Sequence, residues 1–166
     1  MKIVLYVFLG ITGLVLLQLC VHWLSYSYLK NKVVRSRKWG LNICSGKTDG
    51  GGVNADIFYH IEIPNFVHIE DIYNLPFQDK KFDSVLCSHT LEHVDDPHKF
   101  YEELHRVGRD VVLLLPPLWD VGAVLNFMEH RWIFLTLRTK HSKIPRFIPL
   151  PFARTLQNLL GQRMHA

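Results

Sequence analysis

Apolar residues dominate the start of the chain. Residues 3–24 contain no Asp, Glu, Lys or Arg, and their clearly polar positions are Thr12, Gln18 and His22. An uncharged run of this length can span a bilayer as a helix, which needs ~20 residues. A cleaved secretory signal would have a shorter apolar core and small residues at a cleavage site, and neither is present. The pattern predicts a transmembrane anchor over residues 1–29, with an uncleaved or atypical signal peptide as the alternative.

Further along, short apolar runs alternate with turn-rich segments. Strands are predicted within residues 39–46, 53–63, 65–72, 82–88 and 110–117. A helix is predicted within residues 95–108, because Asp96 can cap it, Pro97 suits its first turn and Gly108 suits its end. Continuous apolar strands that alternate with a helix are typical of a parallel sheet covered on both faces. The fold class is therefore α/β.

Charge divides the chain into three blocks. Residues 1–38 carry six Lys/Arg and no acid, residues 39–129 carry all fifteen acids against six Lys/Arg, and residues 130–166 carry seven Lys/Arg and no acid. Five of the first six basic residues form a juxtamembrane flank at 30–38, so the positive-inside rule places the following domain in the cytoplasm. The central block is acidic, which argues against a nucleic-acid partner. The three cysteines form no C-x-x-C pair and fit a reducing compartment.

The C-terminal block interleaves basic and aromatic residues. Prolines at 145, 149 and 151 predict an extended segment, and residues 153–166 are compatible with a short amphipathic helix. The block can be a solvated basic edge. We favour a surface that contacts anionic headgroups beside the anchor, where each basic residue contributes roughly 1 kcal/mol.

One stretch suggests metal chemistry. His89, Glu92 and His93 have the spacing H-x-x-E-H, which in inverted zinc peptidases supplies two His ligands and a Glu base. Such a site needs a stable helix and a further acidic ligand. Here an apolar strand ends at Cys87, and residues 95–97 start a new helix just afterwards. We therefore predict no metal ligand and place the segment at the open end of the sheet, where ligands bind. A zinc hydrolase using these three residues is the remote alternative.

Five segments follow one another in an order that can be compared with known families. They are "LNICSG" at 41–46, "NADI" at 54–57, "EDIYNLPF" at 70–77, the run at 82–108, and "VVLLLPP" at 111–117. This succession resembles the class I S-adenosylmethionine-dependent methyltransferases, in particular the type-11 branch. The resemblance covers roughly residues 39–117 and is most specific from 71 to 107. It implies a Rossmann-like, mostly parallel sheet, S-adenosylmethionine as cofactor, and methyl transfer.

Cofactor-binding candidates follow the first two strands. Small residues are needed where a ligand approaches the backbone, and Ser45 and Gly46, next to Cys44, meet that need. Asp56 can accept both ribose hydroxyls, with a turn-capping Asp as the alternative.

The remaining candidates lie after the third and fourth strands. By resemblance, Asp71 and the backbone of Ile72 contact adenine, although Asp71 can equally cap a loop. Ser88 and His89 are expected to face the methionine end of the cofactor and the acceptor. His93 is either a structural partner in this turn or a general base, so His89 and His93 are the candidate catalytic residues.

The chain also departs from the family pattern. Asn42 replaces the usual acid before the glycine loop, and of its glycines only Gly46 remains, with Cys44 and Thr48 at the other positions. The tail gives little sign of the two antiparallel strands that usually follow strand five, so truncation of the sheet at that point is left open. A truncated sheet would expose an edge.

Two functions from different classes follow. The first is a single-pass membrane methyltransferase whose acceptor is a lipid-linked or small molecule near the bilayer. The second is a degenerate, non-catalytic methyltransferase fold that acts as a membrane interaction module.

Overall fold

The computed structural model describes residues 2–161. Met1 and residues 162–166, at the outer ends of the predicted anchor and the predicted C-terminal segment, lie outside the described residues. The elements in chain order are α1 (Lys2–His22), η1 (Trp23–Leu29), α2 (Lys30–Val34), β1 (Leu41–Ile43), β2 (Val53–Asp56), β3 (Phe66–His68), β4 (Phe82–Ser88), α3 (Pro97–Val107), β5 (Gly108–Leu114), α4 (Val121–Val124), β6 (Trp132–Phe134), β7 (Lys140–His141), β8 (Phe147–Pro149) and α5 (Ala153–Leu160).

Within the described residues, the main sheet has six strands in the order β3-β2-β1-β4-β5-β7. The first five are parallel, and β7 pairs antiparallel with the end of β5. This arrangement confirms the predicted Rossmann-like, mostly parallel fold. The sheet does not stop at strand five, because Leu113 and Leu114 pair with His141 and Lys140. Strand β7 was not predicted because its two residues are too few to show a hydrophobic period.

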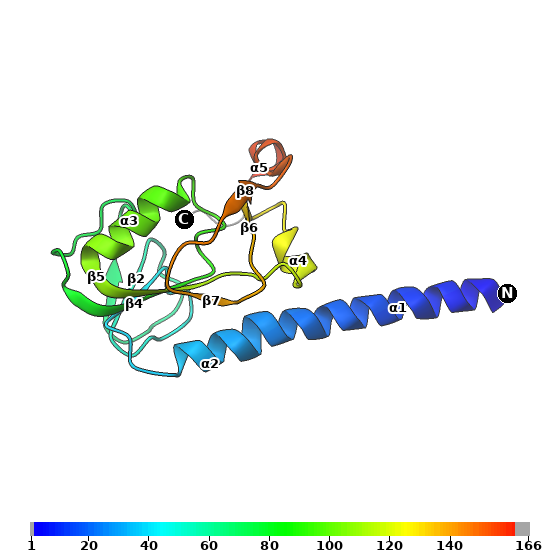
Figure 1. The fold of residues 1–166 in the computed structure, drawn as a ribbon, viewed down its shortest axis with the longest axis horizontal. Helices are drawn as coiled ribbons and strands as arrows, with labels where there is room; N and C mark the ends of the chain where they lie inside the picture. Colours follow the sequence, from blue (N-terminus) through cyan, green and yellow to red (C-terminus); the bar gives the residue numbers. More distant parts are fainter. Residues whose placement is uncertain (1, 162–166) are drawn as a thin grey trace.

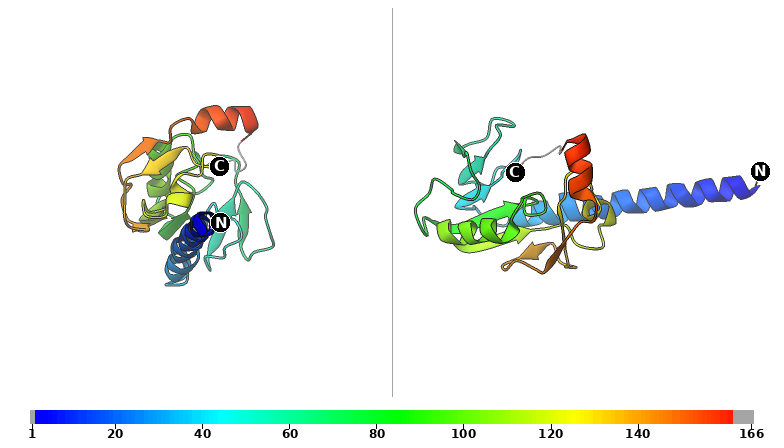
Figure 2. Two further views of the ribbon diagram at one scale, coloured as in Figure 1. Left: turned by 90° about the vertical axis from the view of Figure 1, so that its right-hand side faces the viewer. Right: turned by 90° about the horizontal axis from the view of Figure 1, so that it is seen from above.

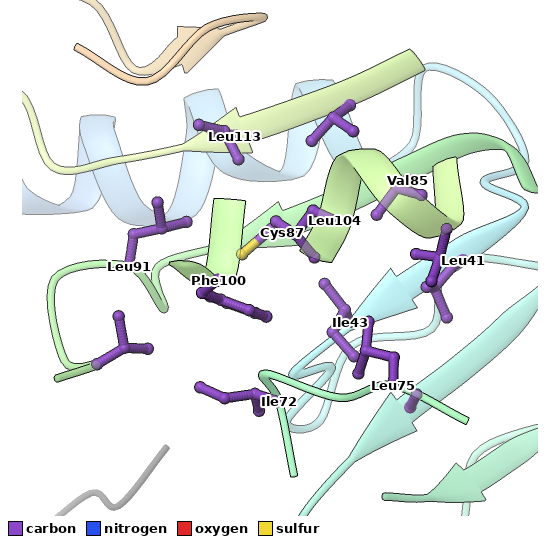
Figure 3. Close-up of a cluster of buried hydrophobic side chains, with 14 of the residues drawn as sticks. Leu41, Ile43, Ile72, Leu75, Val85, Cys87, Leu91, Phe100, Leu104 and Leu113 are labelled. Atoms are coloured by element: carbon purple, nitrogen blue, oxygen red, sulfur yellow. The ribbon is translucent and has the colours of Figure 1, made fainter. Parts of the chain in front are cut away.

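Helix α3 covers one face of the sheet. Asp96 caps it by accepting hydrogen bonds from the backbone N–H groups of His98 and Lys99 at 3.0 and 3.1 Å, which confirms the predicted start. Phe100 and Leu104 pack against Val85 and other strand residues in the main core, shown in Figure 3. The largest hydrophobic cluster therefore lies between α3 and the sheet.

The end of the long N-terminal helix packs against the other face of the sheet. Val34, at its end, packs with Trp39, Leu86, Val112 and Leu114. Leu86 is on the opposite face from Val85, as the alternation of a strand requires. In Figure 1 the helix runs beneath the sheet, and α1 projects far beyond the domain.

The helix therefore has a free part and a docked part. Residues Lys2–Val34 form one helix that is long enough and apolar enough to cross a membrane, by length and composition alone. No part of its most apolar 18-residue stretch is buried. Its docked part meets Asp120, a fully buried residue just before α4. The Asp120 carboxylate accepts from Gln18 Nε2 at 3.1 Å, lies 3.0 Å from His22 Nδ1 and also accepts from the Ser25 hydroxyl.

The C-terminal part forms a small unit beside the sheet. Strands β6 and β8 pair antiparallel, and α5 follows them. In Figure 1 and in the right-hand view of Figure 2, α5 lies at the end of the domain from which α1 projects. The described part of the predicted amphipathic helix is therefore present, and in Figure 1 it lies on the side of the domain opposite the N-terminal helix.

Candidate functional site

A cavity of about 810 Å³ lies at the carboxyl ends of β1, β2 and β4. This volume is within the usual range for ligand pockets, roughly 300–1,000 Å³. Most of its lining comes from four segments: the loop after β1, the loop after β2, the turn after β4, and the docked part of the N-terminal helix. Parallel sheets bind ligands at this end, where strand order reverses beside β1.

The loop after β1 has the conformation of a glycine loop with fewer glycines. Cys44 has a φ of +50° and Gly46 a φ of +56°, so both occupy the left-handed region. A Cβ on Gly46 would meet no atom within 4 Å, so its backbone borders open space. Burial raises the pKa of the Cys44 thiol, and nearby Asp56 raises it further, so the thiol stays protonated. Cys44 therefore lines the cavity as a small neutral group.

Asp56 ends β2 and faces this loop. Its Oδ2 accepts from the Gly46 N–H at 2.7 Å, and its Oδ1 accepts from the Phe58 N–H at 3.2 Å. The residue is 7% exposed and lines the cavity. The two amide donors fix the carboxylate plane, and each oxygen keeps a second acceptor position. The structure thus brings the predicted residues Cys44, Ser45, Gly46 and Asp56 together.

The turn after β4 supplies the opposite wall. Ser88, His89 and His93 all line the cavity, and His89 has a φ of +54°. Such non-glycine conformations are uncommon and cluster at functional sites. Residues 89–93 form turns rather than a helix, as the His93 N–H donates to the Thr90 carbonyl at 2.9 Å. The helical geometry of a zinc peptidase motif is therefore absent from this segment.

Asp71 and Ile72 lie outside the cavity lining. Asp71 is exposed, and its carboxylate accepts from the Tyr73 N–H at 2.8 Å. Ile72 is 2% exposed and packs in the main core. Their contact with adenine stays a prediction.

Several lining residues were not found from the sequence. Tyr26 and Lys30 reach the cavity from the N-terminal helix, and the Tyr26 ring lies 4.9 Å from that of His89. Phe58, Tyr59 and His60 line it from the loop after β2. An aromatic cluster directly after the acid-ending strand was a usable signal for the second group. The helix residues gave no local signal, because their position depends on docking at Asp120.

A second group of side chains lies behind this wall. Glu92, His93 and His130 are all buried, and one potential ligand atom from each lies within 4.8 Å of the others. Burial alone would raise the pKa of Glu92, but the hydrogen bond with His89 and the three nearby histidines bring it to about 2. Burial lowers the pKa of His130 to about 4. The group is therefore an ionised carboxylate among imidazoles, of which His130 is neutral at pH 7.

Comparison with known proteins agrees with the sequence resemblance. Residues 53–114 match the family described as a methyltransferase domain. This match confirms the predicted resemblance and implies S-adenosylmethionine as the cofactor. The search among curated proteins found no match to the chain.

Some solved structures are similar to the chain at low sequence identity. One is a SAM-dependent methyltransferase from Thermotoga maritima, with 18% identity, TM-score 0.43, and coverage of 68% of this chain and 61% of that one. Another is the PH0226 protein from Pyrococcus horikoshii, with 15% identity, TM-score 0.44, and coverage of 82% and 79%. A third is a chain from a complex of the Haloferax volcanii Trm112 methyltransferase activator, with 19% identity, TM-score 0.42, and coverage of 57% and 52%. The chain thus spans less than two thirds of the first and third of these.

The residues present fit the implied cofactor. The Ser45 and Ser88 hydroxyl oxygens are buried and have no hydrogen-bond partner within residues 2–161, yet both residues line the cavity. Buried hydroxyls are normally paired, so these two are available to a polar ligand. Together with open space at Gly46 and acceptor capacity on Asp56, they suit a ligand with a charged amino-acid end and a diol.

Proposed function

We propose that the protein transfers a methyl group from S-adenosylmethionine to an acceptor near a membrane. The observation that carries this proposal is the cavity at the carboxyl ends of β1, β2 and β4. Gly46, Asp56 and two serine hydroxyls that have no hydrogen-bond partner among residues 2–161 converge there. The methyltransferase match of residues 53–114, which includes Asp56 and Ser88, supports the assignment.

Within this proposal, each residue has a separate role. Asp56 accepts the ribose hydroxyls, the backbone at Cys44–Gly46 borders the methionine end, and Ser45 and Ser88 bind its polar groups. The bound cofactor supplies an electrophilic methyl group, so aligning the acceptor and excluding water account for most of the rate. We assign the acceptor to the part of the cavity lined by His89 and Tyr26, whose ring centroids lie 4.9 Å apart. His93 Nδ1 lies 3.0 Å from the Glu129 carbonyl oxygen.

The membrane part of the proposal rests on exposed apolar surface. The large hydrophobic side chains of residues 3–17 are 53–78% exposed. Val121 and Leu125 beside the helix, and Phe152, Leu159 and Leu160 around α5, are exposed as well. Figure 1 shows that α4 and α5 lie toward the end of the domain from which α1 projects. We propose a single-pass anchor with the domain on the cytoplasmic side, to be tested with reporters fused at each end.

Calorimetry with S-adenosylmethionine on the full-length protein in detergent micelles tests the cofactor site. Asp56→Ala is expected to weaken binding tenfold or more, which corresponds to about 1.4 kcal/mol. Asp83→Ala is the matched control, because its side chain is 90% exposed and lies outside the cavity lining. Asp71→Ala in the same titration decides whether Asp71 contacts the cofactor.

A folded protein that binds no cofactor would instead support the non-catalytic membrane module. Replacement of the glycine by Cys44 in a left-handed conformation is the observation in favour of that second function.

A further inference from the structure

Glu92 contributes a buried carboxylate oxygen that no described residue pairs with. Glu92 is 0% exposed, and its Oε2 has no hydrogen-bond partner among the described residues. An unpaired carboxylate oxygen is costly to bury, so such oxygens are normally paired or bound to metal. Its other oxygen, Oε1, lies 3.2 Å from His89 Nδ1. This contact fixes the carboxylate so that Oε2 alone is available to a ligand.

Two imidazoles stand beside this oxygen. His130 is 6% exposed, and its Nδ1 is also buried without a partner among the described residues. The rings of His93 and His130 lie edge to face with centroids 4.7 Å apart. His93 Nδ1 lies 3.0 Å from the Glu129 carbonyl oxygen, to which it donates, and one ring nitrogen of His93 is among the potential ligand atoms of the group. Metal-binding histidines are commonly oriented by this kind of backbone hydrogen bond.

We propose that Glu92, His93 and His130 bind a divalent first-row transition-metal ion. Two imidazoles and one carboxylate suit Zn²⁺, Mn²⁺ or Fe²⁺, and three protein ligands leave a coordination position open. At metal–ligand distances of about 2.0–2.2 Å the donor atoms lie about 3–4 Å apart. The observed separation of up to 4.8 Å therefore closes by small side-chain rotations.

The position of the ion indicates what it would bind. His93 belongs both to this group and to the cavity lining, so an ion on its ring lies at the cavity wall. We infer that the open position takes an oxygen donor of the acceptor, such as a hydroxyl or phenol. This second step rests on the proposed methyl transfer, whereas metal binding does not. The site differs from a zinc peptidase site, because His130 replaces His89 as the second imidazole and residues 89–93 are not helical.

Metal binding is tested on the tag-free, full-length protein in detergent after chelation and dialysis. Titration with Zn²⁺ or Mn²⁺ is expected to give one ion per chain, and Co²⁺ to give a visible absorption band typical of low-symmetry coordination. Glu92→Gln and His130→Asn are expected to weaken Zn²⁺ binding at least tenfold. His98→Asn is the matched control, because His98 is an exposed histidine on α3 outside the group.

Several results would overturn the proposal. These are the absence of stoichiometric binding in the wild type, or equal Zn²⁺ affinity in Glu92→Gln, His98→Asn and the wild type. If a variant fails to fold, the wild type alone remains decisive, since saturating Zn²⁺ must then raise its unfolding temperature and Mg²⁺ must not. Metal binding without cofactor binding would support the metal site and refute the proposed methyl transfer, so the two failures are distinguishable.

Discussion

Replacing Arg106 on α3 is expected to destabilise the protein strongly. Its guanidinium donates from Nε and Nη2 to both oxygens of Glu103, at 2.8 and 2.7 Å. It also donates to the carbonyls of Leu75 and Phe77 at 2.9 and 2.8 Å, while Glu103 accepts from the Leu75 N–H at 2.6 Å. The pair therefore connects α3 to the Leu75–Phe77 turn.

The expected loss of stability follows from the partly buried Glu103 carboxylate that Arg106→Ala leaves without its counter-charge. The Glu103 side chain is 10% exposed and would lose its counter-charge, while Arg106 itself is 33% exposed. Breaking a buried pair costs about 3–5 kcal/mol, and the partial exposure places this case near the lower end, at about 3 kcal/mol. For a chain of this size each kcal/mol lowers the melting temperature by about 2–4 °C, so a decrease of about 6–12 °C is expected.

Thermal denaturation of the full-length protein in micelles, followed by circular dichroism, measures this change. Arg109→Ala is the control, because its pair with Asp83 is 61% and 90% exposed and is expected to contribute about 0–1 kcal/mol. The double variant Glu103→Leu with Arg106→Leu is expected to be less destabilised than the sum of the single variants. If Arg106→Ala melts within 2 °C of Arg109→Ala, the assigned role of the network is wrong.

The other predictions concern pH, helix docking and one close backbone contact. Burial alone would raise the pKa of Glu103, but its hydrogen bonds with Arg106 and Leu75 lower it below the ordinary value. The stabilising contribution of the Glu103 carboxylate is therefore present above about pH 4.3 and is lost as pH falls through its pKa in the folded protein. In acid titrations between about pH 5 and 3, the wild type should lose more stability than Glu103→Gln. Asp120→Ala should release the docked helix and increase hydrogen exchange around residue 25 at least tenfold, and unchanged exchange would contradict the docking. Gly108→Ala would place a Cβ 2.4 Å from Val85 Cγ2, so a loss of about 1–3 kcal/mol is expected in denaturant melts, with partial rescue by Val85→Ala in the double variant.

The parts of the fold that sequence predicted depend on local patterns. Helix α3 was predicted from Asp96, Pro97 and Gly108, all of which act on the ends of one element. The parallel strands were placed from uninterrupted apolar runs such as that in β5. Asp56 was chosen because a carboxylate in the second predicted strand can accept both ribose hydroxyls.

The parts that sequence did not predict depend on contacts between distant segments. His130 joins Glu92 and His93 from a loop nearly forty residues downstream, and no spacing rule connects them. Tyr26 lines the cavity only because Gln18, His22 and Ser25 contact Asp120 far along the chain. Polar residues at 18, 22 and 25 of an otherwise apolar helix are a stripe at helical spacing, which in retrospect indicated a packed face.

The docked helix also determines how far the cavity lies from the membrane. Tyr26 follows Gln18 by eight residues, which is about 12 Å along a helix axis. In the single-pass arrangement proposed above, and with Gln18 placed at the boundary of the bilayer, Tyr26 and the cavity wall that it forms are held about 12 Å above the hydrocarbon. Because the helix is part of the cavity wall rather than a flexible tether, this level cannot adapt to the acceptor. An acceptor embedded in the membrane must therefore present its methylated atom at that height, so the length of its headgroup becomes a criterion of selection.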